Sequence, residues 1–306
     1  MSATTESIRR PETYALGHTT LEWERLRAQA RDWETATVRI LGQLTLPEDA
    51  SCLDAGCGPG ETTRLLAQRV GPGGRVLGID VDADIGAVAL EMLHGGGYRR
   101  CAFRAHDLAA DEPVPGGPFD LVYARLLLIH LPDRAAALAR LWDAVAPGGY
   151  LVVQDYDASA FGVVADLPSF AELTRVILDT FRATGADVRT GALLPQLFVQ
   201  AGVGCPDGTD VAGHVEPLGR GGRTYAVNVY RSLLPAALAH GITTEYESAA
   251  LLAELAQDTA LFASSPVLWP LLIGAWKRKG LPDPPEESAS RPCGRASVIV
   301  PPFGHR

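Results

Sequence analysis

The chain has 306 residues, of which 47% are hydrophobic and 21% are charged, a composition that belongs to folded globular proteins and excludes an intrinsically disordered chain. Its 36 acidic residues outnumber its 27 Lys and Arg residues and give a formal net charge of −9; the basic residues are scattered, which argues against a nucleic-acid partner. The segment Met1–Arg10 lacks the apolar core of a signal peptide, and the most apolar stretch, Val267–Trp276, is too short to span a membrane, so we expect a cytoplasmic protein.

The first half of the chain predicts an N-terminal helix or helix pair over Leu21–Leu44, followed by alternating strands and helices. The expected strands are Ser51–Asp54, Arg75–Ile79, Arg100–Ala105, Phe119–Ala124 and Tyr150–Asp155, and the expected helices are Glu61–Val70, Ala83–Leu93 and Arg134–Ala146. Strands joined by helical crossovers are parallel and buried on both faces. The order therefore predicts an α/β fold, with a doubly wound, mostly parallel Rossmann-like sheet that carries helices on both faces.

After Asp155 the pattern becomes mainly helical, with one further strand expected near Thr209–Glu216 and a last one at Val267–Trp276, where Pro270 indicates an edge or a bulge. The later helices are expected at Ser169–Thr184, Leu193–Ala201, Tyr225–Ala239 and Glu245–Gln257. The domain organisation we expect is an N-terminal helical cap at 1–45, a Rossmann-like cofactor-binding core at 46–217, a helical lid insertion at 218–262, a final core strand at 263–280 and a Pro-rich flexible tail at 281–306.

The five cysteines are odd in number and dispersed, without the paired spacing of a zinc site. We expect reduced thiols and no bound metal. The cysteines are Cys52, Cys57, Cys101, Cys205 and Cys293.

A glycine-rich segment, Leu53–Gly60, ends the first strand and opens the next helix, so that backbone can approach a ligand at the carboxyl edge of the sheet. Its spacing is Gly-x-Gly-x-Gly, which departs from the Gly-x-Gly-x-x-Gly of a nicotinamide-dependent oxidoreductase. Asp54, just before the glycines, suits a cationic ligand better than a pyrophosphate. Asp80 ends the second strand, where a carboxylate can accept hydrogen bonds from both ribose hydroxyls; the alternative is that Asp80 caps the following helix.

Further motifs follow in order, at His106–Leu108, at Phe119–Asp133 and at Pro147–Gly149. Together with the glycine segment they resemble class I S-adenosylmethionine-dependent methyltransferases of the small-molecule type, found in natural-product and quinone pathways. The resemblance implies S-adenosylmethionine as the cofactor and a small-molecule acceptor, and it covers about half of the chain. The residues it assigns to the cofactor are Tyr14, Asp54, Gly56, Cys57, Gly58, Asp80, Val81, Asp107, Leu108 and Arg125.

Within that resemblance, Asp107 accepts a hydrogen bond from the adenine amino group, Arg125 contacts the methionine carboxylate, and Tyr14 with His18 closes over the cofactor. Asp107, Tyr14 and His18 each have a structural alternative. Asp107 would otherwise be a turn carboxylate, Tyr14 would pack on the first helix and His18 would lie at the surface.

Methyl transfer to oxygen or nitrogen requires that a proton be removed, and His130 and Asp155 are the candidate bases because both should face the cofactor edge of the sheet. His130 would otherwise cap a helix or fill the core. Aromatic residues after Asp155 would form a hydrophobic acceptor pocket, and methylation of a carbon atom there would need no base. These aromatic residues are Tyr156, Phe161, Phe170, Phe181, Phe198, Tyr225, Tyr230 and Trp269.

We therefore expect an enzyme of secondary metabolism that methylates an O, N or C atom of a small hydrophobic acceptor, and a homo-oligomer is compatible with the sequence. The first alternative is a non-methylating cyclase on the same fold, or C-methylation coupled to cyclisation, because fold does not fix function. The second is a nicotinamide oxidoreductase, and the third is a module that binds the cofactor without turnover.

Overall fold

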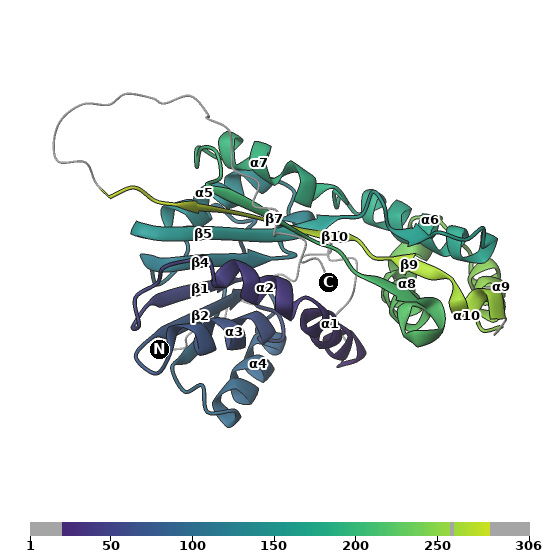
Figure 1. Ribbon diagram of the computed structural model, residues 1–306, viewed down its shortest axis with the longest axis horizontal. Coiled ribbons are helices and arrows are strands. Elements are labelled where there is room, and N and C mark those ends of the chain that lie inside the picture. Colours follow the sequence, from purple (N-terminus) through teal and green to yellow (C-terminus); the bar gives the residue numbers. More distant parts are fainter. Residues whose placement is uncertain (1–19, 258–259, 282–306) are drawn as a thin grey trace, which may run out of the picture.

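A seven-stranded sheet forms the centre of the computed structural model, which describes residues 20–257 and 260–281. The strand order is β3-β2-β1-β4-β5-β10-β7 (Figure 1). The first five strands run parallel, and β10 is antiparallel to both of its neighbours. Their bounds are β1 Ser51–Ala55, β2 Arg75–Asp80, β3 Cys101–Ala105, β4 Phe119–Arg125, β5 Val145–Asp157, β7 Gly208–Ala212 and β10 Leu271–Arg278. The predicted Rossmann-like α/β fold is confirmed.

Helices cover both faces of this sheet, α5 and α7 on one side and α2, α3 and α4 on the other (Figure 1). All five residues of β1 are buried, since the strand lies between β2 and β4 in the interior of the sheet. Helix α3 has the predicted bounds. The helices are α1 Thr20–Asp32, α2 Glu34–Leu41, α3 Glu61–Val70, α4 Ala83–Gly95, α5 Arg134–Asp143 and α7 Thr190–Gln200.

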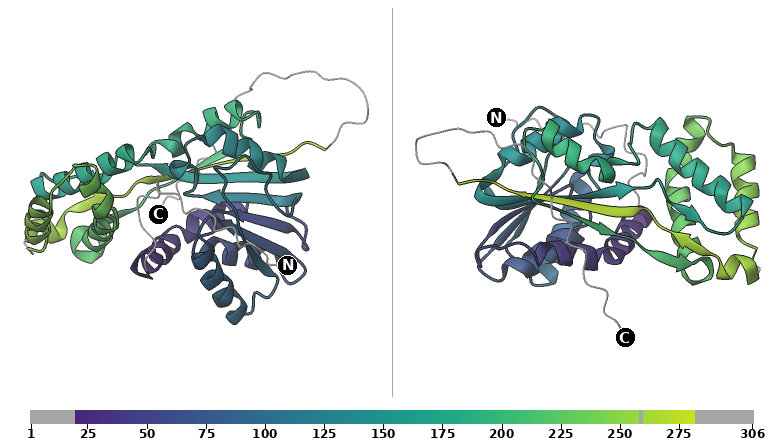
Figure 2. Two further views of the ribbon diagram at one scale, coloured as in Figure 1. Left: turned by 180° about the vertical axis from the view of Figure 1, so that it is seen from behind. Right: turned by 45° about the horizontal axis from the view of Figure 1, so that its top comes forward.

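A second, mostly helical layer lies beyond one end of the sheet, and the other two views agree on this placement (Figure 2). It has its own hydrophobic core, in which Leu173 and Ile177 pack with Tyr230 and Leu233. A small sheet of order β6-β9-β8 completes it. Its elements are β6 Gly162–Val163, α6 Pro168–Ala183, β8 Val215–Pro217, α8 Gly222–Ala239, α9 Glu245–Leu255, α10 Ala260–Ser264 and β9 Pro266–Leu268. We call this layer the lid.

The lid begins earlier in the chain than the expected range 218–262, because α6 has its main contacts with α8 and α9. Two expected strands are also divided between the layers. The strand expected at Thr209–Glu216 is β7 in the main sheet and β8 in the lid sheet, and the strand expected at Val267–Trp276 is β9 and β10. The second break falls at Trp269–Pro270, where Pro270 has no N–H group for a ladder.

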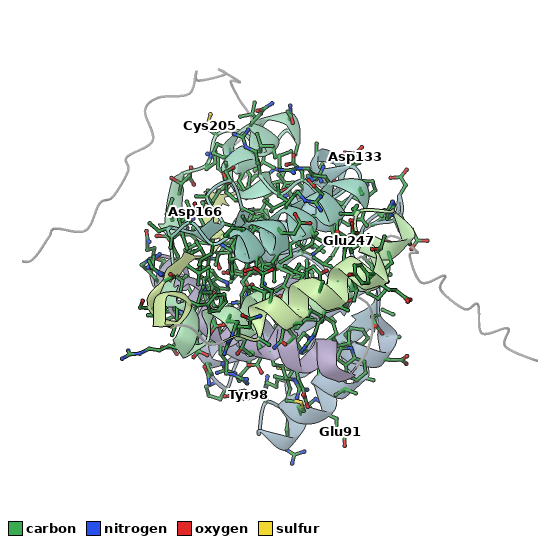
Figure 3. All side chains as sticks on the ribbon, turned by 90° about the vertical axis from the view of Figure 1, so that its right-hand side faces the viewer. Glu91, Tyr98, Asp133, Asp166, Cys205 and Glu247 are labelled. Atoms are coloured by element: carbon green, nitrogen blue, oxygen red, sulfur yellow. The ribbon has the colours of Figure 1, made fainter. Side chains whose placement is uncertain are left out.

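Cys52, Cys57 and Cys101 are free thiols, as expected, whereas Cys205 is disulfide-bonded and the expectation of a reduced thiol there is wrong. Cys205 lies near the molecular edge in Figure 3. Cys293, Tyr14, His18 and nearly all of the expected tail fall outside the described residues.

The described residues contain no candidate for a membrane-spanning helix or for a metal site. None of the helices there combines the length and apolarity needed to cross a membrane. Residues 20–257 and 260–281 also contain no group of three or more His, Cys, Asp or Glu side chains placed to hold a metal ion.

Helix α7 packs closely on β5 through Gly191, where an added Cβ would overlap the backbone of Asp155 and Tyr156. We expect Gly191→Ala to lower the free energy of unfolding by about 1–3 kcal/mol, as overpacking against rigid backbone does. Chemical denaturation measures this. The matched control is Gly95→Ala, at the exposed end of α4, where an added Cβ meets no atom within 4 Å. Equal stability of the two variants would contradict the packing described here.

Candidate functional site

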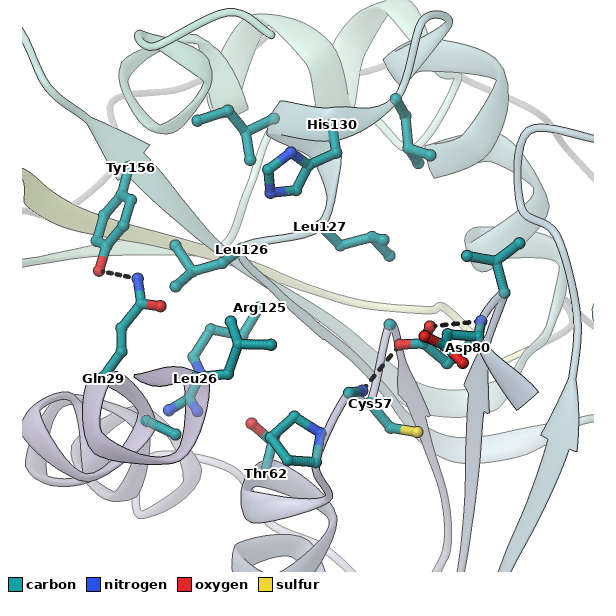
Figure 4. Close-up of a pocket in the computed structure, with 18 of the residues that line it drawn as sticks. Leu26, Gln29, Cys57, Thr62, Asp80, Arg125, Leu126, Leu127, His130 and Tyr156 are labelled. Carbon is teal, nitrogen blue, oxygen red and sulfur yellow. Dashed lines mark hydrogen bonds between the residues drawn. The ribbon is translucent and has the colours of Figure 1, made fainter. Parts of the chain in front are cut away.

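A cavity lies where the loops after β1, β2, β3 and β4 meet helix α1 and the lid (Figure 4). Asp80 and Tyr156 lie on opposite sides of it, and the ring of His130 projects toward the space between them. The residues assigned to the cofactor that line the cavity are Gly56, Cys57, Gly58, Asp80, Val81, Asp107, Leu108 and Arg125. The sheet topology therefore gathers at one edge side chains that are far apart in the sequence.

The glycine loop follows β1 and is fixed to β2, since the backbone N–H groups of Gly56 and Cys57 donate to the carbonyl oxygen of Ile79 over 2.8 and 3.0 Å. Gly58 has a φ of +47°, a conformation that favours glycine, and a Cβ added to it would meet no protein atom within 4 Å. This backbone thus forms a cradle open toward the cavity, where a ligand can approach it closely.

Asp80 is held at the end of β2 by two backbone N–H groups, with Gly58 N 2.8 Å from Oδ2 and Asp82 N 3.0 Å from Oδ1. Burial raises the pKa of this carboxyl group above its usual value, and the backbone donors oppose that shift. The backbone of Val81 gives a further hydrogen bond, and the carboxylate as a whole keeps acceptor capacity because its two oxygens accept about four hydrogen bonds. Asp82, and not Asp80, caps α4, since its Oδ1 accepts from Asp84 N and Ile85 N.

The loop after β3 contributes His106, Asp107 and Leu108 to the same wall. The Oδ1 atom of Asp107 accepts a hydrogen bond from Ala109 N over 2.8 Å. This is the hydrogen bond of a turn carboxylate, the alternative role considered for Asp107. His106 Nε2 is buried without a hydrogen-bond partner among the described residues, and burial lowers the pKa of this imidazole. An unpaired polar atom in a cavity wall is a contact point for a ligand, because its desolvation is otherwise uncompensated.

Arg125 lines the cavity between the glycine loop and the N-terminal helices, and its Nη1 donates to Thr37 Oγ1 over 3.0 Å. The cavity wall thus offers a glycine cradle, a carboxylate with acceptor capacity, an imidazole nitrogen that has no partner among the described residues, and a guanidinium. These hydrogen-bonding groups fit S-adenosylmethionine, which carries a ribose diol, an adenine and a methionine carboxylate.

Asp54 and Asp155 do not line the cavity, so the structure departs from the expected contacts of both. The carboxylate of Asp54 accepts a 2.6 Å hydrogen bond from Thr63 Oγ1 on α3 and is 1% exposed. Burial raises its pKa to about 7. A fully buried strand gives no alternation of polar and apolar residues from which to read the direction of this side chain.

Asp155 is wholly buried at the end of β5 and accepts from Ile129 N over 3.0 Å and from Tyr156 N over 2.9 Å. Burial raises its pKa to about 7 against the effect of these donors. Ile129 belongs to the short 3-10 helix Leu128–His130, so Asp155 fixes the turn that carries His130. Asp155 therefore positions His130 and does not itself line the cavity.

His130 lines the cavity and its ring centroid lies 6.4 Å from that of Phe181 in the lid. Burial lowers the pKa of the imidazole to about 4, and Arg25 and Arg134 add to that shift. The ring is therefore neutral near pH 7 and able to accept a hydrogen bond from a polar group in the cavity.

The lid side of the cavity is apolar and aromatic. Four of the eight predicted aromatic residues line it, namely Tyr156, Phe161, Phe181 and Tyr225, whereas Phe170, Phe198, Tyr230 and Trp269 do not. Sequence reasoning missed the contribution of α1, which brings Trp23, Arg25, Leu26 and Gln29 to the cavity. Helical periodicity indicates that such a helix packs on something, but it does not identify the partner.

Comparisons with known proteins agree on one family. The family described as "Methyltransferase domain" matches residues 23–203, which is more than half of the chain. The trans-aconitate 2-methyltransferase of Variovorax paradoxus is 39% identical over 115 residues, covering 38% of this chain and 42% of that protein. The enzyme of the same name from Azoarcus sp. is 33% identical over 148 residues, covering 47% and 52%. The match thus spans about half the length of these relatives or less.

Two solved structures share the fold. A putative methyltransferase from Bacillus halodurans superposes with a TM-score of 0.54 at 13% identity, covering 80% of this chain and 99% of that one. The YcgJ protein from Bacillus subtilis gives a TM-score of 0.51 at 14% identity, covering 81% and 100%. At these identities the likeness concerns the fold alone.

The low pKa of His130 has a measurable consequence. The unfolded chain takes up a proton near pH 6.5 that the folded imidazole does not take up until about pH 4. His130 therefore lowers the free energy of unfolding as the pH falls from about 6.5 to about 4. We expect His130→Asn to remove that part of the pH dependence. An NMR titration of the imidazole, with the variant as the assignment control, measures the pKa directly; a value near 6.5 would contradict the burial described here.

Proposed function

The chain belongs to the methyltransferase domain family, and from this premise we propose that it transfers the methyl group of S-adenosylmethionine to an O, N or C atom of a small hydrophobic acceptor. The observation that carries the proposal is the division of one cavity into two walls. The strand-end wall presents Gly58, Asp80 and His106, and the lid wall is largely apolar. Such a division suits a polar cofactor beside an apolar acceptor.

On the strand-end wall, the carboxylate of Asp80 would accept hydrogen bonds from the ribose hydroxyls and Arg125 would bind the methionine carboxylate. The backbone at Gly58 lets the cofactor approach without a side chain between them. His106 Nε2 would gain a partner that the described residues do not supply. When bound, S-adenosylmethionine would supply a methyl group on a positively charged sulfur; the acceptor atom would attack the methyl carbon in line, and the sulfur would leave as the thioether of S-adenosylhomocysteine.

The chain's own contribution to rate is then alignment and exclusion of water. Lid residues such as Phe161 and Phe181 close the cavity over the acceptor. For an oxygen or nitrogen acceptor, His130 would accept the departing proton, with Asp155 holding its turn in place. An imidazole with a pKa of about 4 is a weak base at pH 7, which favours acceptors that are themselves acidic or a carbon acceptor that needs no base.

The relatives named above take their name from trans-aconitate, a tricarboxylate, and the charges of this cavity favour a different acceptor. Among the described lining residues the arginines are Arg25 and Arg125. The guanidinium of Arg25 already binds both carboxylate oxygens of Glu22, with Nε 2.8 Å from Oε2 and Nη2 2.6 Å from Oε1. A buried acceptor with several negative charges would lack free cations to balance it among the described lining residues, which supports an uncharged, apolar acceptor and, with it, a place in secondary metabolism.

The cytoplasmic location and a homo-oligomeric state stay predictions from the sequence. The cyclase alternative is separable by experiment. A methyltransferase releases S-adenosylhomocysteine in step with acceptor consumed, whereas a cyclase converts its substrate without consuming the cofactor.

Calorimetric titration with S-adenosylmethionine tests the cofactor wall. We expect Asp80→Asn to weaken binding about tenfold to a hundredfold, because hydrogen bonds to a charged group are worth about 1.5–3 kcal/mol. The control is Asp84→Asn, an exposed residue of the same segment that does not line the cavity; its affinity should equal that of the wild type. Equal affinity of Asp80→Asn and the wild type, or preference of the wild type for NADH or NADPH, would contradict the proposal.

A further inference from the structure

Arg125 ends strand β4 and brings a guanidinium to the cavity wall (Figure 4). Its Nη1 lies 3.0 Å from Thr37 Oγ1 on α2. A guanidinium carries five N–H donors and no acceptor, so the threonine oxygen must accept this hydrogen bond. Among residues 20–257 and 260–281 the guanidinium has no other hydrogen bond and no ion pair, so most of its donors remain open to a ligand.

The hydroxyl of Thr37 is bonded in turn to strand β5. Because its oxygen accepts from Arg125, its hydrogen donates to Gln154 Oε1, which lies 3.0 Å from Thr37 Oγ1. Gln154 Oε1 also accepts from the hydroxyl of Tyr123 on β4. In the parallel ladder Gln154 is directly opposite Arg125. The hydrogen bonds therefore run from one residue of this pair, through α2, to the other.

These groups are held in a tightly packed interior, where Thr37, Tyr123 and Gln154 are 0% exposed. Helix α2 can come this close because β10 carries Gly274 opposite Gln154, where an added Cβ would overlap Ile40 Cδ1. A buried hydroxyl whose donor and acceptor roles are both filled keeps one orientation. Thr37 therefore gives the guanidinium a fixed point of attachment.

We propose that Thr37 is a positioning residue that orients Arg125 to bind the carboxylate at the methionine end of the cofactor. This inference rests on the proposed function and adds that helix α2, through Thr37 and Gln154, sets how tightly that end is held. A guanidinium binds a carboxylate with two parallel N–H groups, which requires a fixed plane for the guanidinium. Without the Thr37 hydroxyl, the long side chain would lose rotamer freedom when the cofactor binds, at a cost in affinity.

Two ligands separate the ends of the cofactor. These are S-adenosylhomocysteine and 5′-methylthioadenosine, which keeps the adenosine and the thioether but has no amino-acid end. Calorimetry with the full chain gives the Kd of each. We expect the wild type to bind S-adenosylhomocysteine at least about tenfold more tightly, because hydrogen bonds between charged groups are worth that much or more.

Thr37→Val keeps the shape of the side chain without its hydroxyl. It should weaken binding of S-adenosylhomocysteine about tenfold and leave binding of 5′-methylthioadenosine unchanged. Thr37→Ser restores the hydroxyl and should restore the affinity. If Thr37→Val does not bind 5′-methylthioadenosine, Thr37→Ala takes its place and is judged by the same comparison of the two ligands.

A double-mutant cycle tests whether Thr37 acts through Arg125. Arg125→Gln should weaken binding of S-adenosylhomocysteine about tenfold or more and spare 5′-methylthioadenosine. Adding Thr37→Val to Arg125→Gln should then change neither affinity, since the side chain that Thr37 orients is gone. The matched control is Thr180→Val, which removes another wholly buried threonine hydroxyl, on α6, from a residue that does not line the cavity; both affinities should equal those of the wild type.

Three results would overturn the positioning role of Thr37. These are unchanged affinity for S-adenosylhomocysteine in Thr37→Val, equal weakening of both ligands, and an undiminished effect of Thr37→Val in the Arg125→Gln background. The proposed function fails separately, because it is overturned if the wild type binds neither ligand. Binding of both ligands by the wild type leaves it standing when the role of Thr37 fails.

Discussion

Burial of the sheet on both faces is the constraint on which the rest of this structure depends. Helices cover β1, β4 and β5 from both sides, so these strands can offer polar groups to a ligand only at their ends. Parallel strands place those ends at one edge, and the loops after β1 to β4 therefore converge on one cavity. There the backbone N–H of Gly58 donates a hydrogen bond to the carboxylate of Asp80. This bond holds Asp80, at the end of its strand, in the wall of the cavity.

The opposite wall depends on contacts between elements that are distant in the chain. Helix α1 reaches the lid through Glu22 and the end of β5 through Gln29. The connections of β7 to β8 and of β9 to β10 carry the chain between the two sheets. The acceptor half of the cavity is thus shaped by how the lid and the N-terminal helix dock, while the cofactor half is shaped by the sheet itself.

This division explains which features could be predicted from the sequence. The glycine loop and Asp80 are signalled locally, by residue types at a strand end followed by a helix of the predicted bounds. The directions of the Asp54 and Asp155 side chains could not be predicted, because a strand buried on both faces has no alternation of polar and apolar residues. Both carboxylates accept hydrogen bonds inside the protein. Membership of α6 in the lid and the contacts of Gln29 follow from tertiary packing, which periodicity does not encode.

The central claim is that the strand-end wall holds the cofactor and the lid wall holds the acceptor. A crystal structure of the chain with S-adenosylhomocysteine tests it most directly. The account predicts both ribose hydroxyl oxygens at about 2.5–3.0 Å from the carboxylate oxygens of Asp80, with the sulfur facing the apolar half of the cavity near His130. Density for the ligand against the lid aromatics, with Asp80 uncontacted, would contradict it.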